Sequence, residues 1–175
     1  MLWLADSLEA IRDFMSLGGP VLRAIAVTIF LMWVLIIERI IYFRSSMKTM
    51  SRDIHDQWES RPERQSWNAK QIRELMISRF SEASNKGINV IQTLVALCPL
   101  LGLLGTVTGM ISVFQVMAVS GSGNVRAMAA GVSQATVPTM AGMVGALSGV
   151  LFVTILTRRA AREVEYLEDS LTMDH

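Results

Sequence analysis

Neutral polar side chains gather in two long apolar stretches of the sequence, and they are the groups with which this chain could do chemistry. They are Thr106, Thr108, Ser112 and Gln115 in the first stretch, and Ser133, Gln134, Thr136, Thr139 and Ser148 in the second. Hydroxyls and amides donate and accept hydrogen bonds but do not titrate here, so they could hold water or compensate a charge on another molecule. A single Ser or Thr can also bond to its own helix, which is the structural alternative. The amide of Gln134 cannot be fully satisfied in that way, and we expect it to face protein or water.

The surrounding composition is typical of a membrane protein. The chain has 175 residues, of which 51% are hydrophobic and 18% are charged. Between Arg79 and Arg158 the charged residues are Glu82, Lys86 and Arg126. This leaves two charge-free runs, 87–125 and 127–157, and each is long enough for a span of about 20 residues.

Several function classes are disfavoured by the same totals. A net charge of +1 gives no basic patch for nucleic acid. We expect no enzyme activity, because the sequence offers no nucleophile and base pair, carboxylate pair or nucleotide loop. The single cysteine, Cys98, and the distant His55 and His175 provide no metal-ligand spacing, so we expect no metal and no cofactor.

Hydrophobic periodicity divides the chain into seven segments and predicts an all-α membrane protein. Residues 1–19 are expected to form an amphipathic N-terminal helix at the membrane surface, and residues 44–86 two polar helices with a break near Pro62. The C-terminal segment 158–175 keeps one apolar face and is expected to continue the last span out of the membrane. The transmembrane helices are expected at 20–43, 87–119 and 127–157, with a turn at 120–126.

Basic residues set the expected orientation. Nine Lys or Arg residues lie in the 44–86 segment and three follow the last span, whereas the other side carries Arg12, Arg23 and Arg126. The positive-inside rule then places the N-terminus outside and the C-terminus in the cytoplasm. The long helices of the polar segments are expected to extend into the cytoplasm.

Glycines distinguish the second and third spans from the first. The first span has no glycine between residues 21 and 43 and is expected to face lipid. The glycines predicted to allow close helix packing are Gly102, Gly105, Gly109, Gly145 and Gly149. Three spans are too few to enclose a water path, so we expect a ring of subunits that turns the glycine-rich helices inward.

Two motifs resemble the MotA/TolQ/ExbB proton-channel family, especially its ExbB-like and TolQ-like members. The run from Pro99 to Val107 (PLLGLLGTV) resembles the second-span signature of that family. Glu38-Arg39 followed by Tyr42-Phe43 resembles the pattern that closes the first span. With the three-span layout, the resemblance covers nearly the whole chain.

The resemblance implies partners and a site. It implies a pentamer in the bacterial inner membrane around helices of an ExbD-like single-span protein that carries an intramembrane aspartate. This motor would use the proton motive force to energise a TonB-like protein for outer-membrane import of iron-siderophores or vitamin B12. Thr106 and Thr139 match the threonines of the second and third spans in this family and would line the ion pathway.

Gln134 departs from the family pattern, because many relatives carry a glutamate at this position. Gln134 cannot bind or release a proton, so we expect the partner's carboxylate to carry the titration. Pro138 lies beside Thr139 and is expected to kink the third span, because proline removes a backbone donor. These two residues complete the predicted pathway set of Thr106, Thr139, Gln134 and Pro138.

Other interpretations remain open at this stage. Glu38 and Arg39 either anchor the first span at the interface or form ion pairs between neighbouring subunits. A TolQ-like envelope-integrity motor would differ in its partner rather than in its chemistry. A flagellar stator is disfavoured by the three spans, and a passive membrane scaffold would explain the glycines without an ion pathway.

Overall fold

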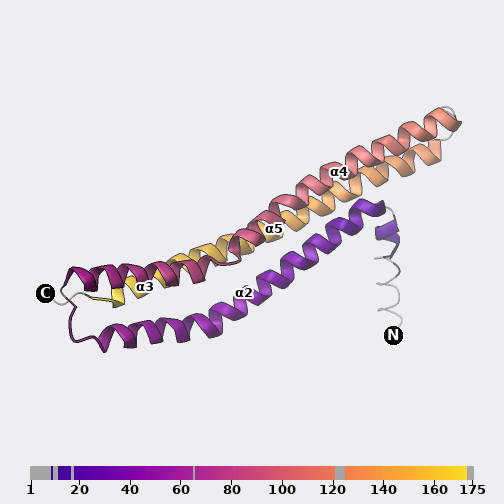
Figure 1. The fold of residues 1–175 in the computed structure, drawn as a ribbon. Coiled ribbons are helices and arrows are strands. Elements are labelled where there is room, and N and C mark those ends of the chain that lie inside the picture. The colour runs from indigo at the N-terminus through magenta and orange to yellow at the C-terminus, as the bar shows by residue number, and fades with distance from the viewer. Residues whose placement is uncertain (1–8, 10–11, 17, 65, 121–124, 173–175) are drawn as a thin grey trace. The chain divides into compact units, whose positions relative to one another are not determined.

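The computed structural model describes residues 9, 12–16, 18–64, 66–120 and 125–172. Its long helices are α2 (Gly19–Glu59), α3 (Trp67–Asn85), α4 (Ile88–Ser120) and α5 (Val125–Ser170), and the described residues contain no strand (Figure 1). Three helical stretches, Gly19–Glu59, Trp67–Val119 and Val125–Ser170, are long and apolar enough to cross a membrane. The prediction of an all-α protein with three helices able to span a membrane is therefore confirmed.

Local sequence signals explain where the helices begin and end. The side chain of Ser66 caps α3 by accepting a hydrogen bond from the backbone N–H of Ala69 at 3.2 Å. Between α3 and α4, Gly87 has a φ of +83°, a conformation that glycine adopts without the steric cost of a Cβ atom. Gly19, at the start of α2, has a φ of +64° for the same reason. The non-helical stretch that follows Glu59 contains Pro62.

Two helices continue through the segment boundaries that hydropathy suggested. α2 runs without a break past residue 43, and α5 runs past residue 157. The helical backbone continues through residues 43 and 157, and only the polarity of the side chains changes there. Most of the predicted N-terminal helix 1–19, and residues 121–124 of the predicted turn 120–126, lie outside the described residues.

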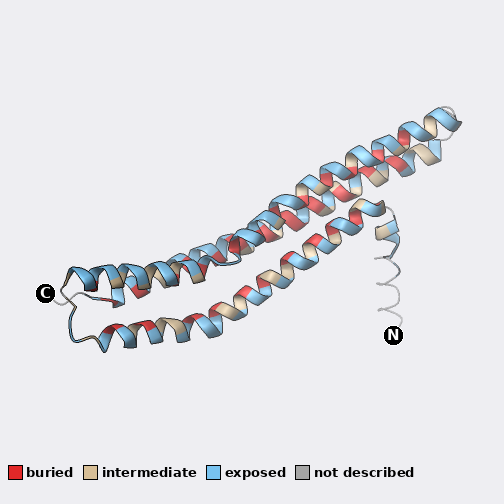
Figure 2. Cartoon of the chain, viewed as in Figure 1, coloured by how far each residue is buried: buried red, intermediate tan, exposed pale blue. Residues whose placement is uncertain are grey.

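The chain divides into two compact units. The first unit comprises Met1–Trp33 and Thr93–Val150, and the second comprises Val34–Gln92 and Leu151–His175. In each unit the buried residues form a stripe along one side of every helix (Figure 2). α2 contributes Ile25 and Met32 to the core of the first unit, and Trp58 to the core of the second.

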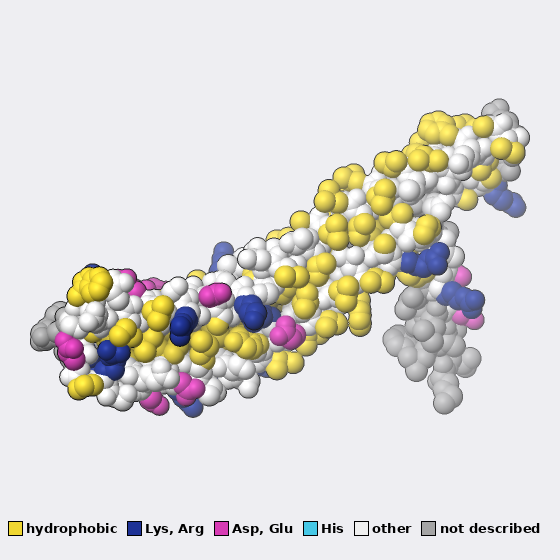
Figure 3. All heavy atoms as spheres, in the orientation of Figure 1, with side chains coloured by type: hydrophobic (Ala, Val, Ile, Leu, Met, Phe, Trp, Pro, Cys, Tyr) yellow, Lys and Arg dark blue, Asp and Glu magenta, His cyan; other side chains and the backbone are white. Residues whose placement is uncertain are grey.

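The surface of the first unit is largely apolar. Large side chains that the rest of this chain leaves uncovered follow α4 and α5, where Figure 3 shows many clusters of apolar side chains. They include Leu103, Val107, Met143 and Leu147. A patch of this size on a soluble protein would be a liability, so lipid or other protein chains must cover it.

Candidate functional site

The α4–α5 contact in the first unit depends on small residues. A Cβ atom at Gly109 would lie 2.5 Å from the Cα of Ala135, and one at Gly142 would lie 2.5 Å from the carbonyl oxygen of Cys98. At Gly131 an added Cβ would meet the side chain of Val113. The absence of side chains at these positions therefore allows the two backbones to approach closely.

Thr139 lies within this contact and joins the two helices. Its Oγ1 donates to the carbonyl oxygen of Gly102 in α4 at 3.1 Å, and it lies 3.4 Å from the carbonyl oxygen of Ala135 in its own helix. A hydroxyl has one proton, so the two carbonyls share it. The preceding residue, Pro138, is fully buried, and its ring fills the space that a Cβ at Gly105 would need. The Thr139 hydroxyl is thus part of the helix interface.

Thr106 has a different environment from Thr139. Its side chain is half-buried, and its Oγ1 donates to the carbonyl oxygen of Leu103 in the same helix at 2.7 Å. Its oxygen retains lone pairs that can accept a proton donor such as water or a protonated carboxylic acid. Thr106 can therefore interact with a group outside this chain without giving up its own hydrogen bond.

Helix geometry separates Gln134 from the two threonines. Gln134 precedes Thr139 by five residues, which corresponds to a rotation of about 140° around an α-helix. Its Nε2 lies beside Gly19 at the start of α2, where an added Cβ would come within 2.5 Å of it. Thr106, by contrast, lies one helical turn from Gly102, the carbonyl that Thr139 contacts. The structure thus places Thr139 against Gly102 of α4 and Gln134 beside Gly19 of α2.

Pro138 removes a backbone hydrogen bond near Gln134. Because proline has no N–H, the carbonyl of Gln134 loses the helical donor that residue 138 would otherwise supply. α5 nevertheless continues as a helix through Pro138. In the sequence, Arg126 is the single ionisable Lys, Arg, Asp, Glu or His residue from 87 to 157.

The predicted glycine positions all lie at close contacts in the first unit. Gly102 and Gly105 face Thr139 and Pro138 of α5, and Gly145 faces Ile29 of α2. Gly149 faces both Val95 and Met32, at the point where α2, α4 and α5 meet. A side chain at any of these positions would require its neighbours to move.

Arg39 has a role within the chain that the sequence did not reveal. Its side chain is only 5% exposed, and its Nη2 donates to the carbonyl oxygens of Ala83 at 2.6 Å and Ser84 at 3.0 Å. The guanidinium carbon also lies 4.6 Å from the centre of the Tyr42 ring. Arg39 therefore caps the C-terminal end of α3, where helix carbonyls lack partners and the helix dipole favours a cation. Glu38 is exposed, and a pairing of these residues between subunits stays a prediction.

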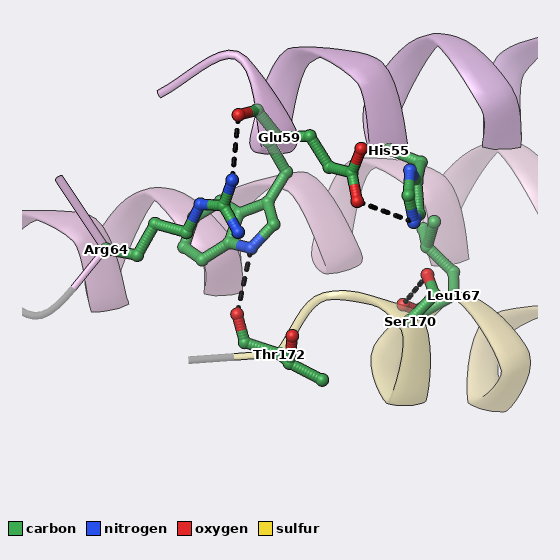
Figure 4. A network of polar contacts seen from close by, with 7 residues as sticks. His55, Glu59, Arg64, Leu167, Ser170 and Thr172 are labelled. Carbon is green, nitrogen blue, oxygen red and sulfur yellow. Dashed lines mark hydrogen bonds and ion pairs between the residues drawn. The ribbon is translucent and has the colours of Figure 1, made fainter. Parts of the chain in front are cut away.

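Two further arginines cap helix ends in the second unit in the same way. Arg73 donates to the carbonyl oxygens of Leu171 and Glu168, both at 2.7 Å, at the end of α5. Arg64 donates to the carbonyl oxygen of Glu59 at 2.8 Å, at the end of α2 (Figure 4). In the same region the indole Nε1 of Trp58 donates to the carbonyl oxygen of Thr172 at 3.0 Å. Sequence reasoning missed all of these, because none of the three helices has a basic residue in its own last turn.

Comparison with known proteins agrees with this architecture. Two proteins of Synechocystis sp. named as ExbB-like biopolymer transport proteins are similar to the chain. ExbB-like 1 is 36% identical over 84 residues, which is 46% of this chain and 33% of the relative. ExbB-like 3 is 31% identical over 80 residues, which is 45% of this chain and 38% of the relative. The aligned stretches thus span only about a third of the length of each relative. No solved structure matched the chain.

The family comparison covers far more of the chain than the individual relatives do. The matched region, residues 36–169, begins within α2 and ends one residue before the end of α5. It thus includes the Gly102–Thr139 contact and the caps formed by Arg39 and Arg64. From this match the chain belongs to the MotA/TolQ/ExbB proton channel family.

Proposed function

We propose that this chain is the ExbB-like subunit of a motor in the bacterial inner membrane that is driven by the proton motive force. In this proposal it assembles with an ExbD-like single-span protein and energises a TonB-like protein for outer-membrane import. Family membership and two relatives named ExbB-like support the proposal.

The observation that carries the mechanism is the lack of carboxylates in the second and third spans of this chain. A residue that relays protons must gain and lose one, and residues 87–157 contain only Arg126 as a charged side chain. Gln134 occupies the position at which the family resemblance implies a glutamate in many relatives. The proton must therefore be carried by an acid from another chain, and an aspartate in the partner's span has the required chemistry.

Thr106 and Thr139 take different parts in this mechanism. Thr106 accepts a hydrogen bond from the partner's acid or its water when that acid is protonated, because its oxygen has free acceptor capacity. Thr139 holds α5 against α4 through the 3.1 Å hydrogen bond to the carbonyl oxygen of Gly102. It thereby fixes the position of α4, the helix that carries Thr106. Gln134, beside Gly19, contributes to the position of α2 relative to α4 and α5.

The apolar surface of the first unit supports the proposed ring, because other molecules must cover that surface. α4 and α5 leave Leu103, Val107, Met143 and Leu147 uncovered by this chain. Neighbouring subunits and the partner's helix would cover part of this surface and lipid the rest. A pentamer, the state implied by the family resemblance, would place five Thr106 side chains around the partner.

Purification of the chain from its native membrane in a mild detergent tests this proposal. The proteins that accompany it are identified by mass spectrometry, and its oligomeric state is measured in the same sample. We expect a pentamer together with a single-span protein that has an aspartate within its span. Recovery of a complex whose other members have no intramembrane acid would contradict the proposal and favour a passive scaffold. An envelope-constriction partner in place of a TonB-like protein would contradict the import role and favour the TolQ-like alternative.

A further inference from the structure

Two adjoining apolar grooves open on the first unit between α2 and α5, and the proposed motor function assigns them no role. One groove follows α2 from Leu22 to Trp33 and has a volume of about 480 Å³. The other follows α5 from Met140 to Ser148 and has a volume of about 470 Å³. Phe14, Ile29, Trp33 and Ala141 line both grooves, so the two run next to each other.

The lining of the grooves is apolar along nearly its whole length. Ser148 is the one hydroxyl residue among the described lining residues, and its Oγ donates to the carbonyl oxygen of Gly145 at 2.7 Å. No Asp, Glu, Lys or Arg is among the described residues that line either groove. An occupant must therefore present a hydrocarbon surface.

The length of the first groove corresponds to that of an acyl chain. The α2 residues from Leu22 to Trp33 span about 16 Å at the rise of an α-helix. This length matches one leaflet, which is about half of the 30 Å hydrocarbon core.

A cation stands at the end of α2 where the first groove begins. Arg23 is exposed and lies two helical turns before Phe30, which lines that groove. Figure 3 shows Lys or Arg side chains at this end of α2, next to apolar surface. Arg12, near the groove residue Phe14, is followed directly by Asp13, which offsets its charge. Arg23 is therefore the cation positioned to attract a phosphate.

We propose that these grooves bind a phospholipid, with one acyl chain in each groove and the phosphate at Arg23. Two grooves that share a wall fit a molecule whose two chains leave a single headgroup. The bound lipid would fill the space between α2 and α5 and would favour an anionic headgroup. This proposal does not depend on proton conduction or on the identity of the partner protein.

Native mass spectrometry of the full chain tests the proposal, with the chain first placed in nanodiscs of phosphatidylcholine and phosphatidylglycerol. After extraction into mild detergent, the phospholipids that remain bound to each chain are counted and identified. We expect one retained phospholipid per chain, enriched in phosphatidylglycerol. The variant Ala26→Phe places a ring in the groove and should lose this lipid. Ala24→Phe adds the same ring to an exposed face outside the groove and should retain it.

The Arg23→Gln variant tests the headgroup separately. It should keep the retained phospholipid but lose the enrichment in phosphatidylglycerol, because the acyl contacts remain while the cation is gone. Equal lipid retention in Ala26→Phe and Ala24→Phe would overturn the proposal. Loss of oligomers in Ala26→Phe with an unchanged lipid count would also overturn it, since the groove would then be an interface between copies of the chain. The proposal would also be overturned if the chain retained only detergent and no phospholipid.

Discussion

The two units of this chain hold their helices together by different means. In the first unit, glycines bring the backbones of α4 and α5 so close that a methyl group at Gly109 would overlap Ala135. In the second unit, large side chains such as Trp58 and Phe80 fill the core, and arginines cap the helix ends. The first unit thus relies on close backbone approach, and the second relies on side-chain burial and charge-assisted hydrogen bonds.

The expected surroundings, lipid for the first unit and water for the second, would account for this difference. In a bilayer the surrounding lipid is as apolar as a leucine side chain, so helices gain by fitting together closely rather than by hiding apolar surface. In water, burial of large apolar side chains drives association, and helix carbonyls need partners. The change occurs within α2, near the start of α4 and within α5, each of which contributes residues to both units.

The largest expected effect is in the core of the second unit. Trp58→Ala should lower the free energy of unfolding by about 3–5 kcal/mol, because it removes a side chain that is 1% exposed and its bond to Thr172. Trp67→Ala, at a residue that is 74% exposed, should change it little. Denaturant unfolding followed by limited proteolysis of the 44–86 region would measure both variants. Equal losses would show that burial does not stabilise this unit.

Glycine substitutions should have a smaller effect than Trp58→Ala, in the first unit. Gly109→Ala should cost about 1–3 kcal/mol, because the new methyl group would meet the backbone of α5 at 2.5 Å. Gly102→Ala should cost less, because its nearest contact would be 3.1 Å. Resistance of the detergent-solubilised protein to SDS unfolding would rank the two variants. The reverse order would contradict the close-approach account.

Removal of the Arg39 cap should have an intermediate effect that stays within the second unit. Arg39→Met should cost about 1.5–3 kcal/mol, since the carbonyls of Ala83 and Ser84 lose a charged donor. Hydrogen exchange of the last turn of α3 should become faster in this variant. Arg44→Met, at an exposed position of α2, provides the control. Unchanged exchange in Arg39→Met would show that the cap does not hold α3.

The smallest stability effects separate the two threonines. Thr139→Val should cost about 0.6 kcal/mol, the typical value of a hydrogen bond between helices in a membrane. Thr106→Val should change stability less, since the Thr106 hydroxyl bonds only to its own helix among the described residues. Gradient-driven transport should nevertheless fall in Thr106→Val and remain in Thr108→Val, whose hydroxyl also bonds to its own helix. Full transport in Thr106→Val, in a normally assembled complex, would contradict the proposed role of Thr106.

Side-chain patterns predicted the helical class and the three helices able to span a membrane, because apolar run length and glycine spacing are local properties of the sequence. The predicted pathway set was only partly brought together. Thr139 contacts Gly102, one helical turn from Thr106, whereas Gln134 lies beside Gly19, because residues five positions apart point in different directions on a helix. The arginine caps could not be predicted, since Arg39 and Ala83 are 44 residues apart and meet only through the fold.

Proton flux into liposomes tests the central claim most directly, namely that this chain forms an uncharged wall and a partner carries the proton. The purified chain alone and the chain with its co-purified partner are reconstituted, a pH gradient is applied, and the internal pH is followed. The chain alone should be no more permeable to protons than empty liposomes, and flux should appear with the partner and be lost when the partner's intramembrane aspartate is replaced by asparagine. Proton flux through the chain alone would contradict the claim.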